Sequence, residues 1–450
     1  FLALIRIGVV PVLAMPPHRL TEIGQFVRFS EAAAYVIPDT HRGFDYRAMA
    51  AELGAACDTL RHVFVAGEAG DGQVALGPMI ETPAEAPDFR ADPMDVALML
   101  LSGGTTAVPK LIARTHNDYV YNVKQSARVA GLGPNSVFLA VLPMAHNFTL
   151  GCPGVLGVFA NGGRVVIAPA GDPETIFSLV ERERVTIVSA AVPLIVKWLN
   201  SPLGDRYDFG SLEIMQNGGA KLAPELRKRV RERFACQYQE SFGTSEGLLC
   251  MTGLDDNDER VLNSSGTPIS PHDEIKIVDE SGAEVPDGEA GELLCRGPYT
   301  VRGYYRAPEA DGAAFTPDGF YRMGDVVRKI DGYIYVEGRK KELINRGGEK
   351  ISCTEVEGHL LAHPEIENAC VVAMPDAVYG EKACAFVIMK DGGRLSLDAL
   401  AEFLLGRDIA KFKLPERLEI VDSFPISPAG KVLRRELRET IEGTKNTRSP

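Results

Sequence analysis

The chain has 450 residues, of which 45% are hydrophobic and 24% charged, as in folded proteins with more than one domain. Its net charge of −13 argues against a general nucleic-acid binder, which would carry a basic surface. Because no stretch reaches about 18 consecutive apolar residues, the sequence predicts no membrane span.

The opening run, FLALIRIGVVPVLAM, is apolar, but Arg6 interrupts it and no small-residue cleavage pattern follows. A secretory signal needs such a cleavage site. We therefore expect a core helix that runs into a buried strand. Since the chain opens inside this element and without Met, we also expect the N-terminal part of the natural protein to be missing.

Over the first two thirds of the chain, short apolar runs alternate with amphipathic, charged segments. The runs at 137–144, 164–169, 185–191 and 212–219 predict buried strands. The segments PETIFSLVERER and PELRKRVRERF predict helices between them. This alternation indicates an α/β fold with a mainly parallel sheet covered on both faces, and ligands bind such sheets beyond the carboxyl ends of the strands.

Two changes in the sequence pattern divide the rest of the chain. At about 265–335, the segment EIKIVDESGAEVPDGEAGELLCRG predicts a hairpin with Gly-rich turns, in a smaller β-rich subdomain. After Gly338, the runs ENACVVAMPD and EKACAFVIM and a helix at about 396–405 predict a compact α+β unit. We therefore predict a large domain over 1–338 and a small domain over 339–450.

A loop rich in Gly and Thr, SGGTTAVPK at 102–110, follows a predicted strand at Leu98–Leu101. Small residues let backbone N–H groups approach a polyphosphate, and Lys110 adds positive charge. Pro109 and Leu111 flank Lys110, so the loop is not a Walker loop. By itself such a loop is more often an ordinary turn.

Four further motifs change that interpretation, namely FGTSE at 242–246, YRMGD at 321–325, GRKKE at 338–342 and PAGK at 428–431. Together and in this order, the five motifs resemble those of the adenylate-forming superfamily of acyl-CoA synthetases, nonribosomal peptide synthetase adenylation domains and luciferase. The resemblance covers essentially the whole chain. It implies a large α/β domain, a mobile small domain, and ATP with Mg²⁺. Ala107 departs from the family pattern, which has Gly there.

The resemblance also implies roles for individual residues. Glu246 would hold Mg²⁺ on the triphosphate, Asp325 would accept the ribose hydroxyls, and Arg339 would contact the nucleotide. Lys431 would be the main catalytic residue, bridging the substrate carboxylate and the α-phosphate, and Lys341 would be the hinge of the small domain. The other residues expected to bind the nucleotide are Ser102, Gly103, Gly104, Thr105, Thr106, Lys110, Gly219, Ala220, Phe242, Gly243 and Thr244.

The segment 143–148, PMAHNF, resembles the aryl-acid branch of the superfamily, which activates salicylate or 2,3-dihydroxybenzoate. By that resemblance, His146 orients the carboxylate region as a second catalytic residue. Asn147 would hydrogen-bond the 2-hydroxyl of the acid. Phe148 on one side and Gly219-Ala220 on the other would sandwich the ring.

Cys152 and Leu249 favour salicylate over 2,3-dihydroxybenzoate. A cysteine is a poor hydrogen-bond partner for a 3-hydroxyl, and leaving that hydroxyl buried without a partner costs about 1–3 kcal/mol. The larger Leu also reduces the space, and Ser245 is expected to line the same site. The alternative is that Cys152 and Leu249 are two ordinary apolar core residues.

The sequence therefore predicts an ATP-dependent ligase that converts an aryl acid, salicylate first, into its acyl-adenylate. The acceptor would be the phosphopantetheine thiol of an aryl carrier protein, as in siderophore synthesis, with coenzyme A as the alternative. The contrasting hypothesis is an inactive relative that only binds nucleotide. Eight cysteines without a CxxC pair favour buried thiols and a cytoplasmic protein.

Overall fold

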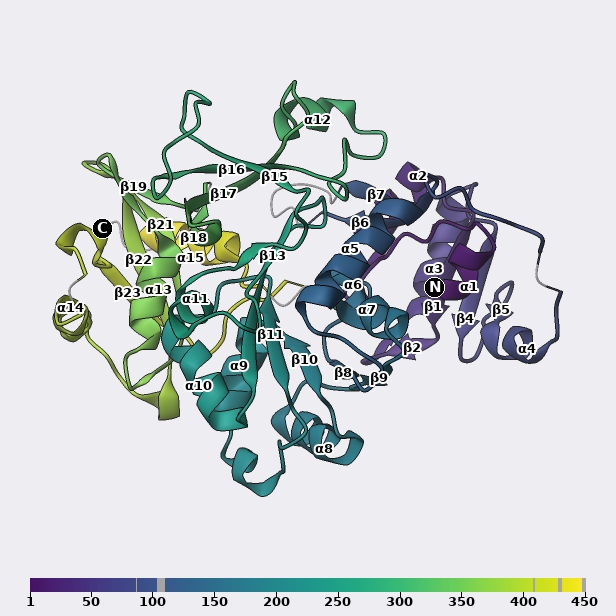
Figure 1. Ribbon diagram of the computed structural model, residues 1–450, viewed down its shortest axis with the longest axis horizontal. Coiled ribbons are helices and arrows are strands. Elements are labelled where there is room, and N and C mark those ends of the chain that lie inside the picture. Colours follow the sequence, from purple (N-terminus) through teal and green to yellow (C-terminus); the bar gives the residue numbers. More distant parts are fainter. Residues whose placement is uncertain (86, 103–109, 341, 408, 428–430, 447–450) are drawn as a thin grey trace. The chain divides into compact units, whose positions relative to one another are not determined.

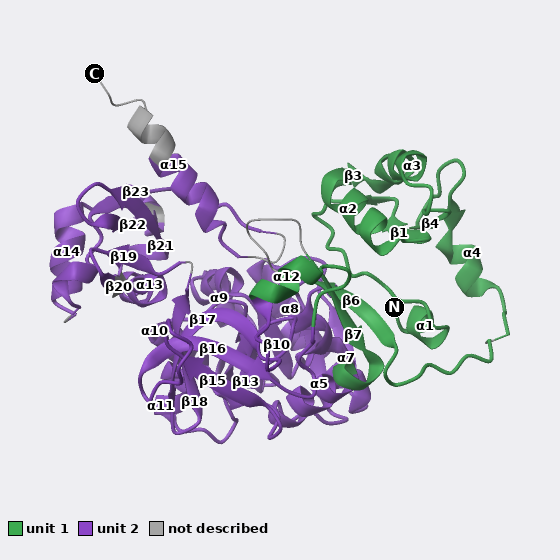
Figure 2. Cartoon of the chain, turned by 90° about the horizontal axis from the view of Figure 1, so that it is seen from above, with its two compact units in different colours: residues 1–119, 303–313 green, residues 120–302, 314–450 purple. Residues whose placement is uncertain are grey.

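The structure is a computed structural model that describes residues 1–85, 87–102, 110–340, 342–407, 409–427 and 431–446. The chain forms two compact units (Figure 2). The first contains residues 1–119 and 303–313, and the second contains residues 120–302 and 314–450.

The first unit contains a parallel sheet in the order β1-β4-β5 and the hairpins β2-β3 and β6-β7 (Figure 1). Its core joins Phe26 of α2 and Leu53 of α3 to Val65 of the sheet. Its elements are α1 (Leu2–Arg6), α2 (Leu20–Ser30), β1 (Ala34–Pro38), β2 (Thr40–His41), β3 (Phe44–Asp45), α3 (Tyr46–Ala56), β4 (His62–Ala66), β5 (Val74–Ala75), α4 (Leu76–Glu81), β6 (Val96–Leu101), β7 (Leu111–Thr115) and most of α12 (Pro308–Ala314).

The main sheet of the second unit has the order β14-β13-β12-β11-β10-β8-β9. The strands from β9 to β12 are parallel, and β13 and β14 are antiparallel. These strands are β8 (Val137–Ala140), β9 (Arg164–Ile167), β10 (Ile187–Ala190), β11 (Ile214–Gly218), β12 (Gln237–Gly243), β13 (Leu249–Met251) and β14 (Thr267–Pro268).

Helices cover both faces of this sheet. Leu139 and Met215 pack with residues of α8, α9 and α10, whereas their neighbours Phe138 and Ile214 pack with Val155 of α7. Consecutive residues of a strand point to opposite faces, so the strands carry apolar residues throughout. The helices are α5 (His116–Val129), which runs from the first unit into the second, α6 (Asn147–Gly151), α7 (Gly154–Ala160), α8 (Pro173–Glu183), α9 (Val192–Leu199), η1 (Pro202–Arg206), α10 (Pro224–Phe234) and α11 (Asp258–Asn263).

The predicted α/β fold with a mainly parallel sheet is confirmed, and each of the four apolar runs contains a strand. One detail was wrong, because β9 is not a buried strand. It is the edge strand of the sheet, and its end residues Arg164 and Ile167 are exposed. An edge strand has a neighbour on one side only, and the apolar run does not reveal this.

Two smaller sheets follow in the second unit. The antiparallel sheet β15-β16-β17-β18 consists of β15 (Glu274–Val278), β16 (Ala290–Arg296), β17 (Tyr321–Ile330) and β18 (Tyr333–Arg339). The last sheet packs with its own core, and its region contains β19 (Ile344–Arg346), β20 (Glu349–Ile351), α13 (Cys353–Leu361), β21 (Ile366–Asp376), β22 (Gly380–Met389), η2 (Lys390–Gly392), α14 (Leu397–Leu405), η3 (Lys411–Lys413), β23 (Arg417–Ile420) and α15 (Arg434–Asn446). We call residues 342–446 the small lobe. The predicted boundary at 338 differs from the limits of the compact units and stays a prediction.

The expected core helix and buried strand at the start of the chain are wrong. Helix α1 has only five residues and buries none of them, and Val9 and Val10 are exposed. Gly8 adopts a φ of +77°, which ends the helix, and only Val12 forms a bridge, with Met99. Apolar content alone does not give a segment a surface to pack against.

The eight cysteines are all free and buried, as expected for small apolar residues. None of the described helices is both long and apolar enough to cross a membrane.

Candidate active site

Three loops at the carboxyl edge of the main sheet carry several of the predicted site residues. The loop after β8 leads through His146 into α6, the loop after β11 contains Gly219 and Ala220, and the turn after β12 contains Glu246. Parallel strands end at the same edge, where ligands of such sheets bind. The sheet therefore brings together residues that are up to 100 positions apart in sequence.

Lys431 reaches this edge from the small lobe. Its N–H donates to Ser427 Oγ at 3.0 Å, and its carbonyl oxygen accepts from the Ser427 N–H at 2.7 Å. Its Cε lies 3.3 Å from the position that a Cβ of Gly219 would occupy. Gly219 has a φ of +89°, so both its backbone and the neighbouring lysine favour glycine there.

A cluster of charges surrounds the Lys431 ammonium group. Nearby protein atoms desolvate this group and Arg339 repels it, and both effects lower the pKa of Lys431. Asp325, Glu342 and Glu246 oppose that shift. The ammonium group thus lies near three carboxylates, which favour its charged form.

Asp325 is a buried acceptor in the same cluster. Its Oδ1 lies 3.0 Å from Arg339 Nε, and Arg339 also donates to the Met323 carbonyl oxygen. Among the residues that the structure describes, Asp325 Oδ2 has no hydrogen-bond partner. Burial raises the pKa of Asp325 to about 6, although Arg339 and Lys431 oppose the rise. A buried oxygen of this kind can accept a hydrogen bond from a hydroxyl group of a ligand.

His146 caps the N-terminus of α6. Its Nδ1 accepts from the Phe148 N–H at 3.2 Å, so Nε2 carries the proton when the ring is neutral. Burial, and then the Lys431 charge, lower the pKa of His146 to about 4. The side chain is therefore neutral at physiological pH and offers one N–H donor beside a cation.

An apolar cluster includes Phe148, which lies two residues after His146 in the sequence. It contains Phe148, Cys152, Leu249, Met251, Ile269, Tyr299 and Ala130, and we call it the Phe148 cluster. Asn147 is buried beside it and its Nδ2 lies 3.4 Å from Cys152 Sγ. The Phe148 ring packs on Gly218, where a Cβ would lie 2.8 Å from Phe148 Cζ. The resemblance predicts Gly219 and Ala220 for this region but not Gly218.

The turn after β12 brings Glu246 to the site. Glu246 is buried, whereas Gly243 is exposed and Phe242, Thr244 and Ser245 are half-buried. Among the described residues, no group of three or more His, Cys, Asp or Glu side chains forms a metal site. A lone carboxylate suits Mg²⁺ that takes its other ligands from phosphates and water.

The predicted phosphate loop lies in the first unit. Ser102 and Lys110 close its base, because the Lys110 N–H donates to Ser102 Oγ at 2.9 Å and the Ser102 N–H donates to the Lys110 carbonyl oxygen. Gly103, Gly104, Thr105, Thr106 and Ala107 lie outside the described residues, and so does the predicted hinge Lys341.

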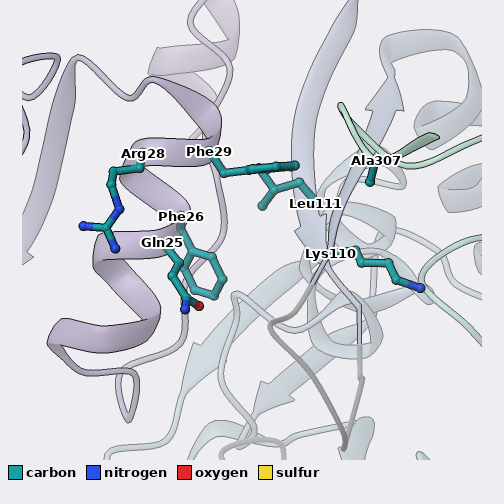
Figure 3. A pocket seen from close by; sticks show the side chains of 7 residues that line it. All are labelled: Gln25, Phe26, Arg28, Phe29, Lys110, Leu111 and Ala307. Carbon is teal, nitrogen blue, oxygen red and sulfur yellow. The ribbon is translucent and has the colours of Figure 1, made fainter. Parts of the chain in front are cut away.

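A cavity of about 440 Å³ in the same unit is lined by polar and apolar side chains, namely Gln25, Phe26, Arg28 and Phe29 of α2, with Lys110, Leu111 and Ala307 (Figure 3). The Lys110 ammonium group lies 4.4 Å from the centre of the Tyr304 ring.

The fold and this grouping of side chains define an adenylate-forming ligase. The profile of the AMP-binding enzyme family matches residues 1–305, and that of the AMP-binding enzyme C-terminal domain matches residues 355–431. The chain belongs to the AMP-binding enzyme family.

Relatives of known name lie in the aryl-acid branch. The chain is 48% identical to a 2,3-dihydroxybenzoate-AMP ligase of Bacillus subtilis over 98% of its own length and 81% of the relative's. It is 44% identical to a salicyl-AMP ligase / salicyl-S-ArCP synthetase of Mycobacterium tuberculosis, over 97% of its own length and 77% of the relative's. The apo structure of Mycobacterium smegmatis MbtA has 41% identity and a TM-score of 0.71, over 97% of this chain and 81% of that one.

Proposed function

We propose that the protein activates an aryl carboxylic acid, preferentially salicylate, as aryl-AMP and then transfers the acyl group to the phosphopantetheine thiol of a carrier protein. The contact of Lys431 with Gly219, among Asp325, Arg339 and His146, is the observation that carries this proposal. At one edge of the sheet, Lys431 would supply a cation, Asp325 an acceptor for the ribose hydroxyls, and His146 an N–H donor.

In the first step, a carboxylate oxygen of the acid attacks the α-phosphorus of ATP, and the bond to the leaving pyrophosphate breaks. Lys431 stabilises the negative charge that accumulates on the carboxylate and phosphate oxygens. The neutral His146 donates a hydrogen bond from Nε2–H to the carboxylate, and Asp325 accepts hydrogen bonds from the ribose hydroxyls. Glu246 would hold Mg²⁺, which neutralises the charge of the departing pyrophosphate.

In the second step, the thiol sulfur attacks the acyl carbon, the bond to AMP breaks, AMP leaves, and the thiol proton passes to solvent. Lys341 would be the hinge about which the small lobe turns between the two steps. Ser102, Lys110 and the loop between them would bind the triphosphate.

The aryl ring would lie against the Phe148 cluster. Asn147 would bond the 2-hydroxyl, and Ser245 would line the same site. Cys152 Sγ is a weak acceptor for a 3-hydroxyl, which supports salicylate over 2,3-dihydroxybenzoate. The latter acid is the second candidate.

Aryl-acid-dependent exchange of labelled pyrophosphate into ATP tests the proposal. Salicylate, 2,3-dihydroxybenzoate and benzoate are compared, with and without Mg²⁺, and we expect the highest kcat/KM with salicylate and no exchange after chelation. Loading of a phosphopantetheinylated carrier protein is then compared with coenzyme A. Absence of exchange with all three acids would leave only the nucleotide-binding hypothesis.

A further inference from the structure

The turn that carries Glu246 and Leu249 has a strained backbone. Leu248 lies between them with a φ of +23°, a region that side chains with a Cβ rarely occupy, and it is fully buried. The facing strand comes so close that a Cβ on Gly243 would lie 2.3 Å from the Leu248 carbonyl oxygen. Such a conformation persists only where the surroundings hold it.

The segment 299–301 holds this turn at three points. The Leu249 N–H donates to Tyr299 Oη at 3.1 Å, and the Val301 N–H donates to the Glu246 carbonyl oxygen at 2.7 Å. Gly247 lies directly against Thr300, because a Cβ on it would be 2.5 Å from Thr300 Oγ1. The segment therefore contacts the turn between the predicted metal ligand and the predicted aryl contact.

Tyr299 is itself held in one orientation. Its hydroxyl donates to Asp273 Oδ2 at 2.6 Å, and its ring stacks on Tyr121 with the centroids 6.0 Å apart. Burial raises the pKa of Asp273 to about 6, so the group is a carboxylate acceptor above that pH. With its proton directed at Asp273, the hydroxyl offers a lone pair to the Leu249 N–H.

Leu249 is fixed at its other backbone group as well, since its carbonyl oxygen accepts from the Ile269 N–H at 2.9 Å. Its side chain packs in the Phe148 cluster together with the Tyr299 ring. Tyr299 thus accepts a hydrogen bond from Leu249 and belongs to the same apolar cluster.

We propose that Tyr299, oriented by Asp273, is a positioning residue that holds Leu249 against the aryl ring and thereby sets which aryl acid the enzyme prefers. This inference deepens the proposed function and rests on it. Tyr299 acts through the backbone of Leu249, so its removal leaves the nucleotide half of the site in place.

Tyr299→Phe tests the proposal, because it keeps the ring and removes only the hydroxyl. In pyrophosphate exchange we expect the KM for salicylate to rise about tenfold, because the variant loses one buried hydrogen bond. The KM for ATP should not change. The preference for salicylate over 2,3-dihydroxybenzoate should fall at least about threefold, since Leu249 then loses one of the two backbone hydrogen bonds that fix it.

Tyr333→Phe is the matched control. Tyr333 also donates to a carboxylate, Asp256 Oδ1 at 2.5 Å, but it does not belong to the Phe148 cluster. We expect this variant to change neither KM nor the preference between the acids.

If Tyr299→Phe does not fold, Asp273→Asn decides, because it leaves the Tyr299 ring and hydroxyl in place. The same loss of preference supports the proposal. An unchanged preference in a folded variant, or an equal rise in the KM for ATP and for the acid, overturns it. The wild-type enzyme is measured beside both variants, and a wild type that is inactive with every aryl acid would instead refute the proposed function.

Discussion

Lys431 is the residue on which the proposed chemistry depends most directly. We expect Lys431→Ala to lose at least about 100-fold in kcat for pyrophosphate exchange, since one preorganised donor contributes about 3 kcal/mol to a transition state. The matched control is Arg435→Ala, an exposed residue that pairs only loosely with Glu439. Exchange within a few-fold of wild type in Lys431→Ala would contradict the proposed role.

Asp325 combines a predicted function with a cost in stability. Its folded-state pKa, about 6, lies above the usual aspartate value of 3.8, so the folded state binds this proton more tightly than the unfolded state. The charged carboxylate therefore opposes folding: this penalty is full above pH 6 and declines as the pH falls from about 6 toward 3.8. The buried carboxylate is consistent with selection for binding.

We therefore expect Asp325→Asn to raise the KM for ATP about 10- to 100-fold, the range for a lost hydrogen bond to a charged group. Its thermal midpoint at pH 8 should not fall below that of wild type. In the wild type the KM for ATP should rise as the pH falls through about 6, and in the variant that rise should be absent. A variant that binds ATP normally would show that Asp325 does not hold the ribose.

At the scale of elements, a buried ion pair fixes the loop that contains Gly219. Arg227 of α10 lies 3.1 Å from Glu240 of β12, and both are almost fully buried. Arg227 also donates to the carbonyl oxygens of Leu222, Val261 and Ser264. Asn217 at the end of β11 donates to Glu240 and to the Ala220 carbonyl oxygen. The network ties three elements to the loop.

Removing one charge from this pair should be costly. We expect Glu240→Gln to lower the free energy of unfolding by about 3–5 kcal/mol, because it leaves Arg227 buried without its counter-charge. Urea denaturation measures this loss. Glu232→Gln, in the exposed pair with Lys228, should lose less than about 1 kcal/mol. Equal losses in the two variants would show that burial is not the cause.

The sequence predicted the central strands of the main sheet better than the edge strand and the first helix. Runs of Val, Ile and Leu located β8, β10 and β11, because a strand covered on both faces must be apolar throughout. The same runs did not reveal that β9 is an edge strand or that α1 buries nothing. Contacts between residues far apart in the sequence could not be predicted either, as for Tyr299 and Leu249, which are 50 positions apart. The five motifs predict candidate site residues through resemblance, but Gly218 and Tyr299 belong to no motif.

At the scale of the whole molecule, one exposed ion pair connects the small lobe to the main sheet's helices. Arg407 donates to Glu225 of α10 at 2.8 Å and to His359 of α13 at 3.3 Å. This pair exists in the arrangement in which Lys431 contacts Gly219. A small lobe that turns between the two steps would have to break it.

We expect Arg407→Ala to slow adenylation by no more than about fivefold, because an exposed pair contributes about 0.2–1 kcal/mol. The thioester step should keep its rate. Pyrophosphate exchange and single-turnover loading of the thiol separate the two effects, and Arg435→Ala serves as the control within the small lobe. A slower second step would argue against a turn that breaks this contact.

Burial of all eight thiols has a practical consequence. Desolvation raises the pKa of Cys236, Cys353 and Cys384 to about 12, so native thiols react slowly with maleimides or iodoacetamides, which require a thiolate. A single exposed replacement such as Arg435→Cys would then accept a fluorophore selectively. With such a dye on α15, the arrival and departure of Lys431 could be followed by fluorescence during turnover, in the otherwise native sequence.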